Sequence, residues 1–187
     1  MSVKLLSILG IVASASCLGV ATRLYPAGYD WSRDYISTLL RGPLGPARIL
    51  ADTGVLLFCV SIALIFERLS RAAEFSGSAK IIRIGGIGSQ VYAGLTITPM
   101  HDLMVTISFV FMLVTMLAIA QGLYVNRETG LLLVGCVCVA ILVASAGVYY
   151  SGQFMFALPW AQKGSLVFFA LWMLSLDAHL PRMRSKP

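Results

Sequence analysis

The chain has 187 residues, of which 58% are hydrophobic and only 12% are charged. Soluble domains carry about a quarter charged residues, so this composition, with a mean hydropathy of +0.86, excludes an ordinary water-solvated globule. The formal net charge of +6 is typical of basic loops that fix orientation in a membrane. It does not indicate nucleic-acid binding, because no basic stripe with interleaved aromatic residues occurs.

Six stretches are apolar and long enough to be membrane-crossing helices, which need about 20 residues. In chain order they cover residues 4–22, 49–67, 82–100, 102–125, 130–150 and 160–177. A backbone in hydrocarbon must satisfy its own hydrogen bonds, so runs of this length are helices. The sequence predicts an all-α fold, a bundle of six transmembrane helices that forms one domain over residues 1–187.

The first stretch has a second interpretation as a secretory signal peptide. Lys4 precedes an apolar run, and Ala13-Ser14-Ala15 provides the small residues of a cleavage site. The apolar run continues beyond that site to Ala21. This continuation favours a helix that the protein retains.

The segment between the first two spans predicts a short amphipathic helix over residues 32–40. Apolar side chains recur there at helical spacing, and polar ones take the opposite face, as in helices that lie in the membrane interface. Ser32 has the residue type of an N-cap, and aromatic residues here would act as interfacial anchors. The residues assigned to this outer interfacial helix are Trp31, Arg33, Asp34, Tyr35 and Ser37.

Small residues gather at the start of the third span, in the run Gly85-Gly86-Ile87-Gly88-Ser89. A dinucleotide-binding fingerprint would follow a strand and open a soluble helix, and neither context is predicted here. Small residues at these spacings let membrane helices pack closely. The same interpretation applies to Gly10 in the first span and to Ser145-Ala146-Gly147 in the fifth.

The pattern predicts neither a cofactor nor a metal site. The four cysteines all lie in apolar runs, where free cysteine behaves as a small hydrophobe. Catalytic zinc takes three protein ligands, and His179 is predicted at the opposite membrane face from His101. A set made of His101 with Asp52 and Asp102 remains only a weak alternative.

Basic residues in the loops predict the orientation of the chain. With six spans, nine basic residues fall on the side of the termini and five on the other side. Loops rich in Lys and Arg stay in the cytoplasm. We therefore expect a multi-pass protein of the cell inner membrane with both termini cytoplasmic.

Ionisable groups inside the predicted membrane boundary gather near the outer side. Asp52 and Lys163 lie about one turn inside the second and sixth spans, and His101-Asp102 forms the turn between the third and fourth. Such groups are costly at this depth and usually pair inside the protein, with Lys163 as the first candidate partner of Asp52. The sequence predicts an outward-facing polar pocket formed by Asp52, His101, Asp102, Lys163, Tyr149 and Gln153.

Each member of this pocket also has a structural interpretation. Asp102 opens a helix, where a carboxylate caps the chain and offsets the helix dipole. Lys163 can extend its ammonium to the headgroups, and His101 fits an ordinary turn. The shared depth of these residues is the argument for a site.

The segment LYPAGYDWSRDYISTLLRGPLGPARILADTGVLLF resembles the start of the bacterial integral membrane family catalogued as domain of unknown function 998. The matching elements are Tyr25-Pro26, Tyr35-Ile36-Ser37-x-Leu39 and Pro46. MHDLMVTISFVF is similar to the family's fourth helix, which starts with a histidine, here His101. WAQKGSLVFFALWMLSLDAHL resembles its last helix, which a basic residue, here Lys163, opens.

This resemblance covers nearly the whole chain and implies a six-helix fold. Family members carry an acidic–basic pair where this chain has Gln162-Lys163, which weakens any inference of a charge relay. A more distant similarity to eukaryotic six-helix proteins linked to lipid remodelling and autophagy implies a function at lipids. It implies no reaction, because a fold does not determine function.

These patterns lead to three hypotheses. The leading one is a small membrane protein whose outer polar pocket binds a lipid or amphiphile headgroup, alone or as an accessory subunit. The second is a membrane-embedded, lipid-modifying enzyme with His101 as base and Asp52 or Asp102 orienting it. The third is a purely structural subunit. Membrane lipids and other membrane protein subunits are the expected partners, and an enzyme is the less favoured class.

Overall fold

The computed structural model describes residues 3–183, and the side chains of residues 3–180. The described chain is helical, without strands. Its α-helices are α1 (Val3–Leu24), α2 (Ile36–Arg41), α3 (Pro46–Ser70), α4 (Ala79–Gly94), α5 (His101–Val125), α6 (Thr129–Ser151) and α7 (Leu158–Met183). Three 3-10 turns join them, η1 (Ala73–Ser78), η2 (Leu95–Ile97) and η3 (Met155–Ala157).

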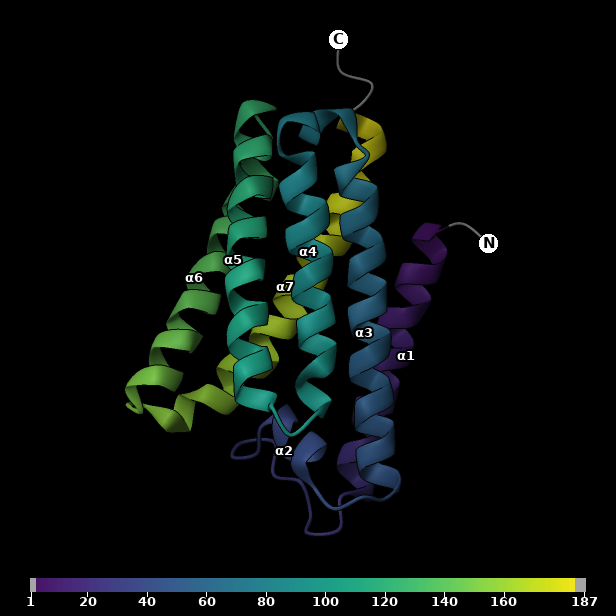
Figure 1. Ribbon diagram of the computed structural model, residues 1–187, viewed down its shortest axis with the longest axis vertical. Coiled ribbons are helices and arrows are strands. Elements are labelled where there is room, and N and C mark those ends of the chain that lie inside the picture. The colour runs from purple at the N-terminus through teal and green to yellow at the C-terminus, as the bar shows by residue number, and fades with distance from the viewer. Residues whose placement is uncertain (1–2, 184–187) are drawn as a thin grey trace.

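The long helices run up and down along one axis, and short α2 closes one end of the bundle (Figure 1). We call this the α2 end, which also carries the α4–α5 and α6–α7 turns. The opposite end, toward which α1 starts and α7 finishes, is the termini end. Within the bundle, α3 packs against α1, α4 and α7, whereas α6 packs mainly along α5 and α7.

Among residues 3–183, four helices are long and apolar enough to cross a membrane, namely α1, α3, α5 and α6. These helices define a membrane protein and confirm the all-helical prediction. The stretch predicted as a third span, 82–100, is divided between α4 and η2, because the helix tightens after Gly94 into a single 3-10 turn. The last stretch lies in α7.

The amphipathic helix after the first span is shorter than predicted. Helix α2 begins at Ile36, and the assignment of Ser32 as its N-cap is wrong. The Asp30 carboxylate accepts hydrogen bonds from both the backbone N–H and the hydroxyl of Ser32, at 2.8 and 2.6 Å. These bonds hold residues 30–32 in a turn, which is a conformation that Asp and Ser side chains favour, so the Ser32 hydroxyl is not available to cap a helix.

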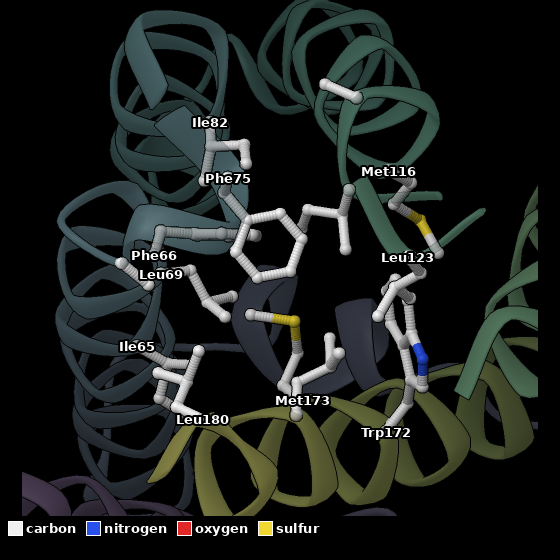
Figure 2. Packing of buried hydrophobic residues seen from close by; sticks show 14 of the residues in the cluster. Ile65, Phe66, Leu69, Phe75, Ile82, Met116, Leu123, Trp172, Met173 and Leu180 are labelled. Atoms are coloured by element: carbon white, nitrogen blue, oxygen red, sulfur yellow. The ribbon is translucent and has the colours of Figure 1, made fainter. Parts of the chain in front are cut away.

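The core lies in the half of the bundle toward the termini end, where buried side chains of α3, α4, α5 and α7 pack together (Figure 2). Several of its aromatic rings lie opposite glycines. A methyl group added at Gly86 would come within 2.5 Å of the Phe66 ring, and one at Gly135 within 2.6 Å of the Trp172 ring. At Gly10 it would overlap the Ser61 hydroxyl. Close helix packing through these small residues is therefore confirmed in the first and third spans.

Gly147 is an exception to that packing rule. Nothing lies within 4 Å of a Cβ built at this residue, so the prediction that it packs against a neighbouring helix is wrong. Helix α6 lies at the edge of the bundle, with Gly135 and Cys138 as its buried residues. Its outer face, including Gly147, is left uncovered by the described part of the chain.

Candidate functional site

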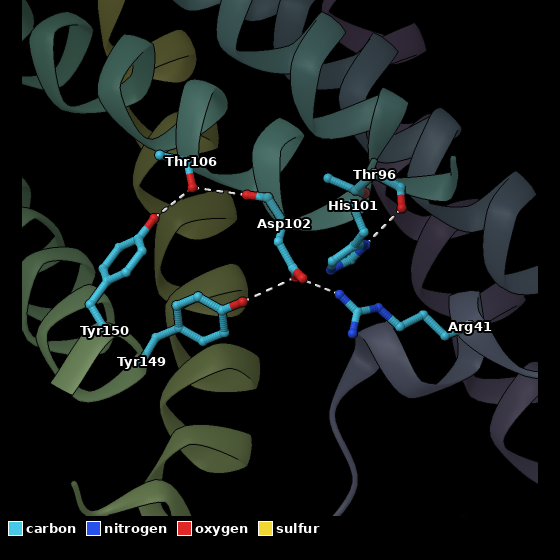
Figure 3. A network of polar contacts seen from close by, with 7 residues as sticks. All are labelled: Arg41, Thr96, His101, Asp102, Thr106, Tyr149 and Tyr150. Atoms are coloured by element: carbon cyan, nitrogen blue, oxygen red, sulfur yellow. Dashed lines mark hydrogen bonds and ion pairs between the residues drawn. The ribbon is translucent and has the colours of Figure 1, made fainter. Parts of the chain in front are cut away.

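The polar residues of the α2 end form two clusters and one isolated pair. The first cluster is centred on Asp102, at the start of α5. Its Oδ1 accepts a hydrogen bond from the Tyr149 hydroxyl at 3.0 Å and forms an ion pair with the guanidinium of Arg41 (Figure 3). One carboxylate thus ties α5 to both α2 and α6.

The apolar side of α2 brings Arg41 to this position. Leu39 and Leu40 are buried in a small cluster with Ala21 of α1 and Ala51 of α3. This packing fixes the short helix across the end of the bundle, so that its last residue, Arg41, reaches Asp102. Burial of two leucines, about 1.5–3 kcal/mol each, therefore positions a charged group.

Helix α6 supplies two tyrosines in its last turn. Gly152, with φ of +67°, takes the left-handed conformation that ends the helix directly after them. Tyr149 contacts Asp102, and Tyr150 shares a 2.6 Å hydrogen bond with the Thr106 hydroxyl. Their rings lie edge to face, with centroids 5.2 Å apart.

His101 is oriented by the backbone of the preceding turn. Its Nδ1 lies 2.7 Å from the carbonyl oxygen of Thr96. A carbonyl only accepts hydrogen bonds, so Nδ1 carries a hydrogen and donates it to this oxygen. Asp102 is not the group that orients this imidazole, which departs from the arrangement expected for an acid–base enzyme.

We call Arg41, His101, Asp102, Tyr149 and Tyr150 the Asp102 cluster. It lies at the surface, because the side chains of Arg41 and Asp102 are 55% and 65% exposed. A crevice of about 60 Å³ lies elsewhere at this end, beside Tyr25, Pro43 and Arg48. None of the six residues predicted for the pocket lines that crevice.

The second cluster surrounds Lys163, near the start of α7. Its ammonium donates to the carbonyl oxygens of Trp31 at 2.7 Å and Asp34 at 2.6 Å. The same nitrogen lies 5.3 Å from the ring centroid of Tyr29 and 5.5 Å from that of Trp31, within range of a cation–π interaction. Lys163 therefore holds the first loop onto α7.

Gln162 extends this attachment to α2. Its side-chain oxygen accepts a 2.9 Å hydrogen bond from the backbone N–H of Ile36, one of the N–H groups that a helix start leaves without a partner. This hydrogen bond between Ile36 and Gln162, which are 126 positions apart in the sequence, joins the start of α2 to α7. The pair Gln162-Lys163 anchors the whole segment from Trp31 to α2.

Two groups of this loop have shifted pKa values. Burial, with a contribution from the Asp34 charge, raises the pKa of the Tyr29 phenol to about 12. The hydrogen bonds from Ser32, with a contribution from Arg33, hold the pKa of Asp30 below its usual range. Near neutral pH, Tyr29 is a neutral donor to the Asp34 carbonyl and Asp30 is ionised.

Asp52 takes a partner from its own helix. Its Oδ2 lies 3.8 Å from the Nε of Arg48, one turn away on α3. The predicted pairing with Lys163 is wrong, because that ammonium is committed to the first loop. The 3.8 Å separation is an ion pair without a hydrogen bond, and buried Asp52 Oδ1 and Arg48 Nε are left without hydrogen-bond partners.

The structure therefore separates the residues that the sequence placed in one pocket. His101, Asp102 and Tyr149 come together, whereas Lys163 belongs to the first loop and Asp52 to α3. Gln153 is exposed after the end of α6. No group of three or more His, Cys, Asp or Glu side chains within the described chain is arranged to hold a metal ion.

Sequence reasoning missed a second ionic network at the termini end. Asp177 of α7 is 1% exposed and pairs with Arg68 of α3 at 2.8 Å, although its Oδ1 has no hydrogen-bond partner. Glu67 binds Arg71 and Arg83. An ionised acid within an apolar helix is costly unless it is paired. Asp177, like Asp52, could therefore have been recognised in the sequence as an acid in a predicted span that needs a basic partner.

Comparison of the chain with family models, with curated proteins and with solved structures gives no match. What the Asp102 cluster offers chemically is a guanidinium, a carboxylate, an imidazole nitrogen and two phenols at the surface of a membrane protein. These groups can donate and accept hydrogen bonds to a polar ligand.

Proposed function

We propose that this chain is a six-span protein of the cell inner membrane whose Asp102 cluster binds the headgroup of a membrane lipid. Besides the four apolar helices, α7 and the continuous segment of α4 with η2 would cross the membrane. Helix α4 runs antiparallel to α3 and α5, and α7 runs antiparallel to α6. With η2, the α4 segment covers residues 79–97, about the length that a span requires.

The excess of basic residues at the termini end supports cytoplasmic termini. Exposed aromatic side chains at the other end support its position in the outer interface, where such rings are enriched. These residues are Trp31, Tyr150, Phe154, Phe156 and Trp160. The Asp102 cluster would then lie at the level of the lipid headgroups.

The observation that carries the proposal is the open polar cluster between α2, α5 and α6. Arg41 uses one of its nitrogens for Asp102, and a guanidinium has five N–H donors, so further donors are available. Lipid phosphates are strong acceptors for such donors. Neighbouring apolar side chains on the lipid-facing surface, such as Val105 and Val110 on α5, are exposed and can contact acyl chains.

Lipid retention tests this proposal. The protein, purified in mild detergent, is exchanged into lipid nanodiscs, recovered with detergent and examined by native mass spectrometry for bound lipid. We expect the wild type to retain lipid and Arg41→Gln to retain about tenfold less, the size of one lost charge-assisted contact. Arg33→Gln, an exposed loop variant at the same end, is the matched control. Equal retention by all three proteins would refute the proposal.

A second proposal is that the chain serves as an accessory subunit of a larger membrane assembly. Helix α6 favours this role, because only 11% of the residues in its most apolar 18-residue stretch are buried. Gentle purification would then recover a stoichiometric membrane partner, and a bulky substitution such as Ala144→Trp on the exposed face of α6 would release it. Recovery of a monomer alone would count against this role.

A further inference from the structure

The acidic groups at the α2 end are consistently matched with basic ones. Arg33 lies 3.7 Å from Asp30, Arg48 lies 3.8 Å from Asp52, and Arg41 is paired with Asp102. The remaining acid of the first loop, Asp34, lies beside Lys163 through its backbone oxygen. Apart from Arg23, every basic side chain of the end is therefore beside an acid or bound to backbone oxygens.

The termini end has a different charge balance. Lys80 and Arg127 are exposed there, and no ion pair joins either to an acid within the described chain. An anionic surface attracts unpaired basic groups. At the α2 end Arg23 is the one basic side chain in the described chain without such a partner, so the charges of this end are closer to balance and suit a ligand that carries both signs.

We propose that the Asp102 cluster recognises a zwitterionic phospholipid headgroup with a primary ammonium, the phosphatidylethanolamine class. This inference rests on the proposed function and specifies the ligand. The free donors of Arg41 bind the phosphate. Both protein contacts of the Asp102 carboxylate use Oδ1, so Oδ2 accepts from the ammonium.

The two tyrosines complete the ammonium side of this site. Tyr149 and Tyr150 direct their hydroxyls at Asp102 and Thr106. Their rings lie edge to face beside these contacts, and a cation is attracted to an aromatic face. The same end already holds the ammonium of Lys163 between backbone oxygens and two rings. A primary ammonium donates hydrogen bonds to Oδ2, whereas a trimethylammonium donates none, so ethanolamine is favoured over choline.

An anionic headgroup fits less well. The charge of Arg41 is balanced by Asp102, so a phosphate that carries no attached cation would add an unbalanced negative charge beside a carboxylate. Like charges in a shared site repel. We therefore expect discrimination against phosphatidylglycerol, with Asp102 as the residue that determines it.

Nanodiscs with equal amounts of phosphatidylethanolamine, phosphatidylcholine and phosphatidylglycerol test the inference. From these discs, native mass spectrometry should find the wild type retaining phosphatidylethanolamine about tenfold over phosphatidylglycerol, the ratio that one charge-assisted contact provides. Asp102→Asn should reduce this ratio to near one while lipid remains bound. Asp30→Asn, which removes an acid of the same end outside the cluster, should leave it unchanged.

The outcomes separate the two proposals. Preferential retention of phosphatidylglycerol or phosphatidylcholine by the wild type, or an unchanged ratio in Asp102→Asn, would overturn the inference and leave lipid binding intact. No difference in total lipid between wild type and Arg41→Gln would overturn the proposed function itself. Tyr149→Phe, which keeps the ring and removes its hydrogen bond to Asp102, provides a second variant if Asp102→Asn fails to fold, and it should lower the ratio.

Soluble phosphoethanolamine distinguishes a lipid from a free metabolite with the same polar group. We expect millimolar phosphoethanolamine to compete only weakly with the lipid, because it lacks the acyl chains that the apolar surface binds. Displacement at equal concentration would overturn the lipid as the source of the headgroup.

Discussion

Replacement of Lys163 by methionine should release the first loop while the helix bundle stays folded. Methionine keeps most of the length of the side chain and removes its ammonium. The loss comprises two hydrogen bonds, to the carbonyl oxygens of Trp31 and Asp34, and two contacts with aromatic rings. The core cluster near the termini end does not include this residue.

The magnitude follows from those contacts. A hydrogen bond to a charged group contributes about 1.5–3 kcal/mol, and each partly exposed cation–π contact about 0.5–1 kcal/mol. Ordering the lysine side chain costs about 1.5–2 kcal/mol of conformational entropy, which offsets part of the stabilisation from these contacts. The bounds of these ranges give about 2–6.5 kcal/mol. The lower part of this interval applies because the contact of the ammonium with Trp31 is exposed, so we expect the loop to be stabilised by about 3 kcal/mol, roughly a hundredfold change in its opening equilibrium.

Hydrogen exchange of the backbone amides measures this change. The amides of Arg33, Asp34 and Ile36, which are bonded in the loop or to Gln162, should exchange about a hundredfold faster in Lys163→Met. Lys80→Met, at an exposed residue of the termini end, is the control. Unchanged exchange in the loop, or equal acceleration throughout α3 and α7, would refute the assignment of Lys163 as a local anchor.

Three further predictions concern packing, a buried ion pair and pH. Gly86→Ala should lower the free energy of unfolding by about 1–3 kcal/mol through overpacking, whereas Gly147→Ala, which faces open space, should not lower it. Denaturation in detergent measures the two free energies, and equal effects of the two variants would contradict this prediction. Asp177→Ala should destabilise by about 3–5 kcal/mol because it strands Arg68, and a double variant with Arg68→Met should recover most of the loss in the same assay. The pKa of Asp30 is lowered in the folded loop. Its contribution to the stability of the loop is therefore present above the unfolded pKa of about 3.9 and is lost as pH falls through the lower folded value. Amide exchange of the loop should show this acid dependence, and Asp30→Asn should abolish it.

The helices could be predicted from the sequence because their cause is local. Runs of about 20 apolar residues must form helices in hydrocarbon whatever surrounds them, and α1, α3, α5 and α6 follow the predicted stretches closely. The predicted start of α2 is too early because Ser32, which has the residue type of an N-cap, stands just before the apolar pattern that begins at Tyr35. A competing turn at Asp30 binds that serine instead, and periodicity does not register such a turn.

The candidate site was predicted in part. His101 and Asp102 can be identified because two polar residues in a tight turn between apolar runs are unusual. Tyr149 can be identified because its place in the fifth predicted span puts it near the same outer boundary of the membrane. Arg41 is not among the residues predicted for the pocket, although it is the ion-pair partner of Asp102. Its participation depends on the packing of α2 across the bundle, which no local pattern encodes.

By itself, the sequence determined that this protein is a helical membrane protein and that polar residues gather where the helices turn. Composition and run length decide those properties, since they depend only on how each segment meets hydrocarbon or water. Only the tertiary structure decided which charges meet. Lys163 binds a loop 129 residues away, Asp52 stays with its own helix, and Asp102 joins Arg41 and Tyr149. A side chain that can reach several partners is assigned one by the angle and rotation of the packed helices.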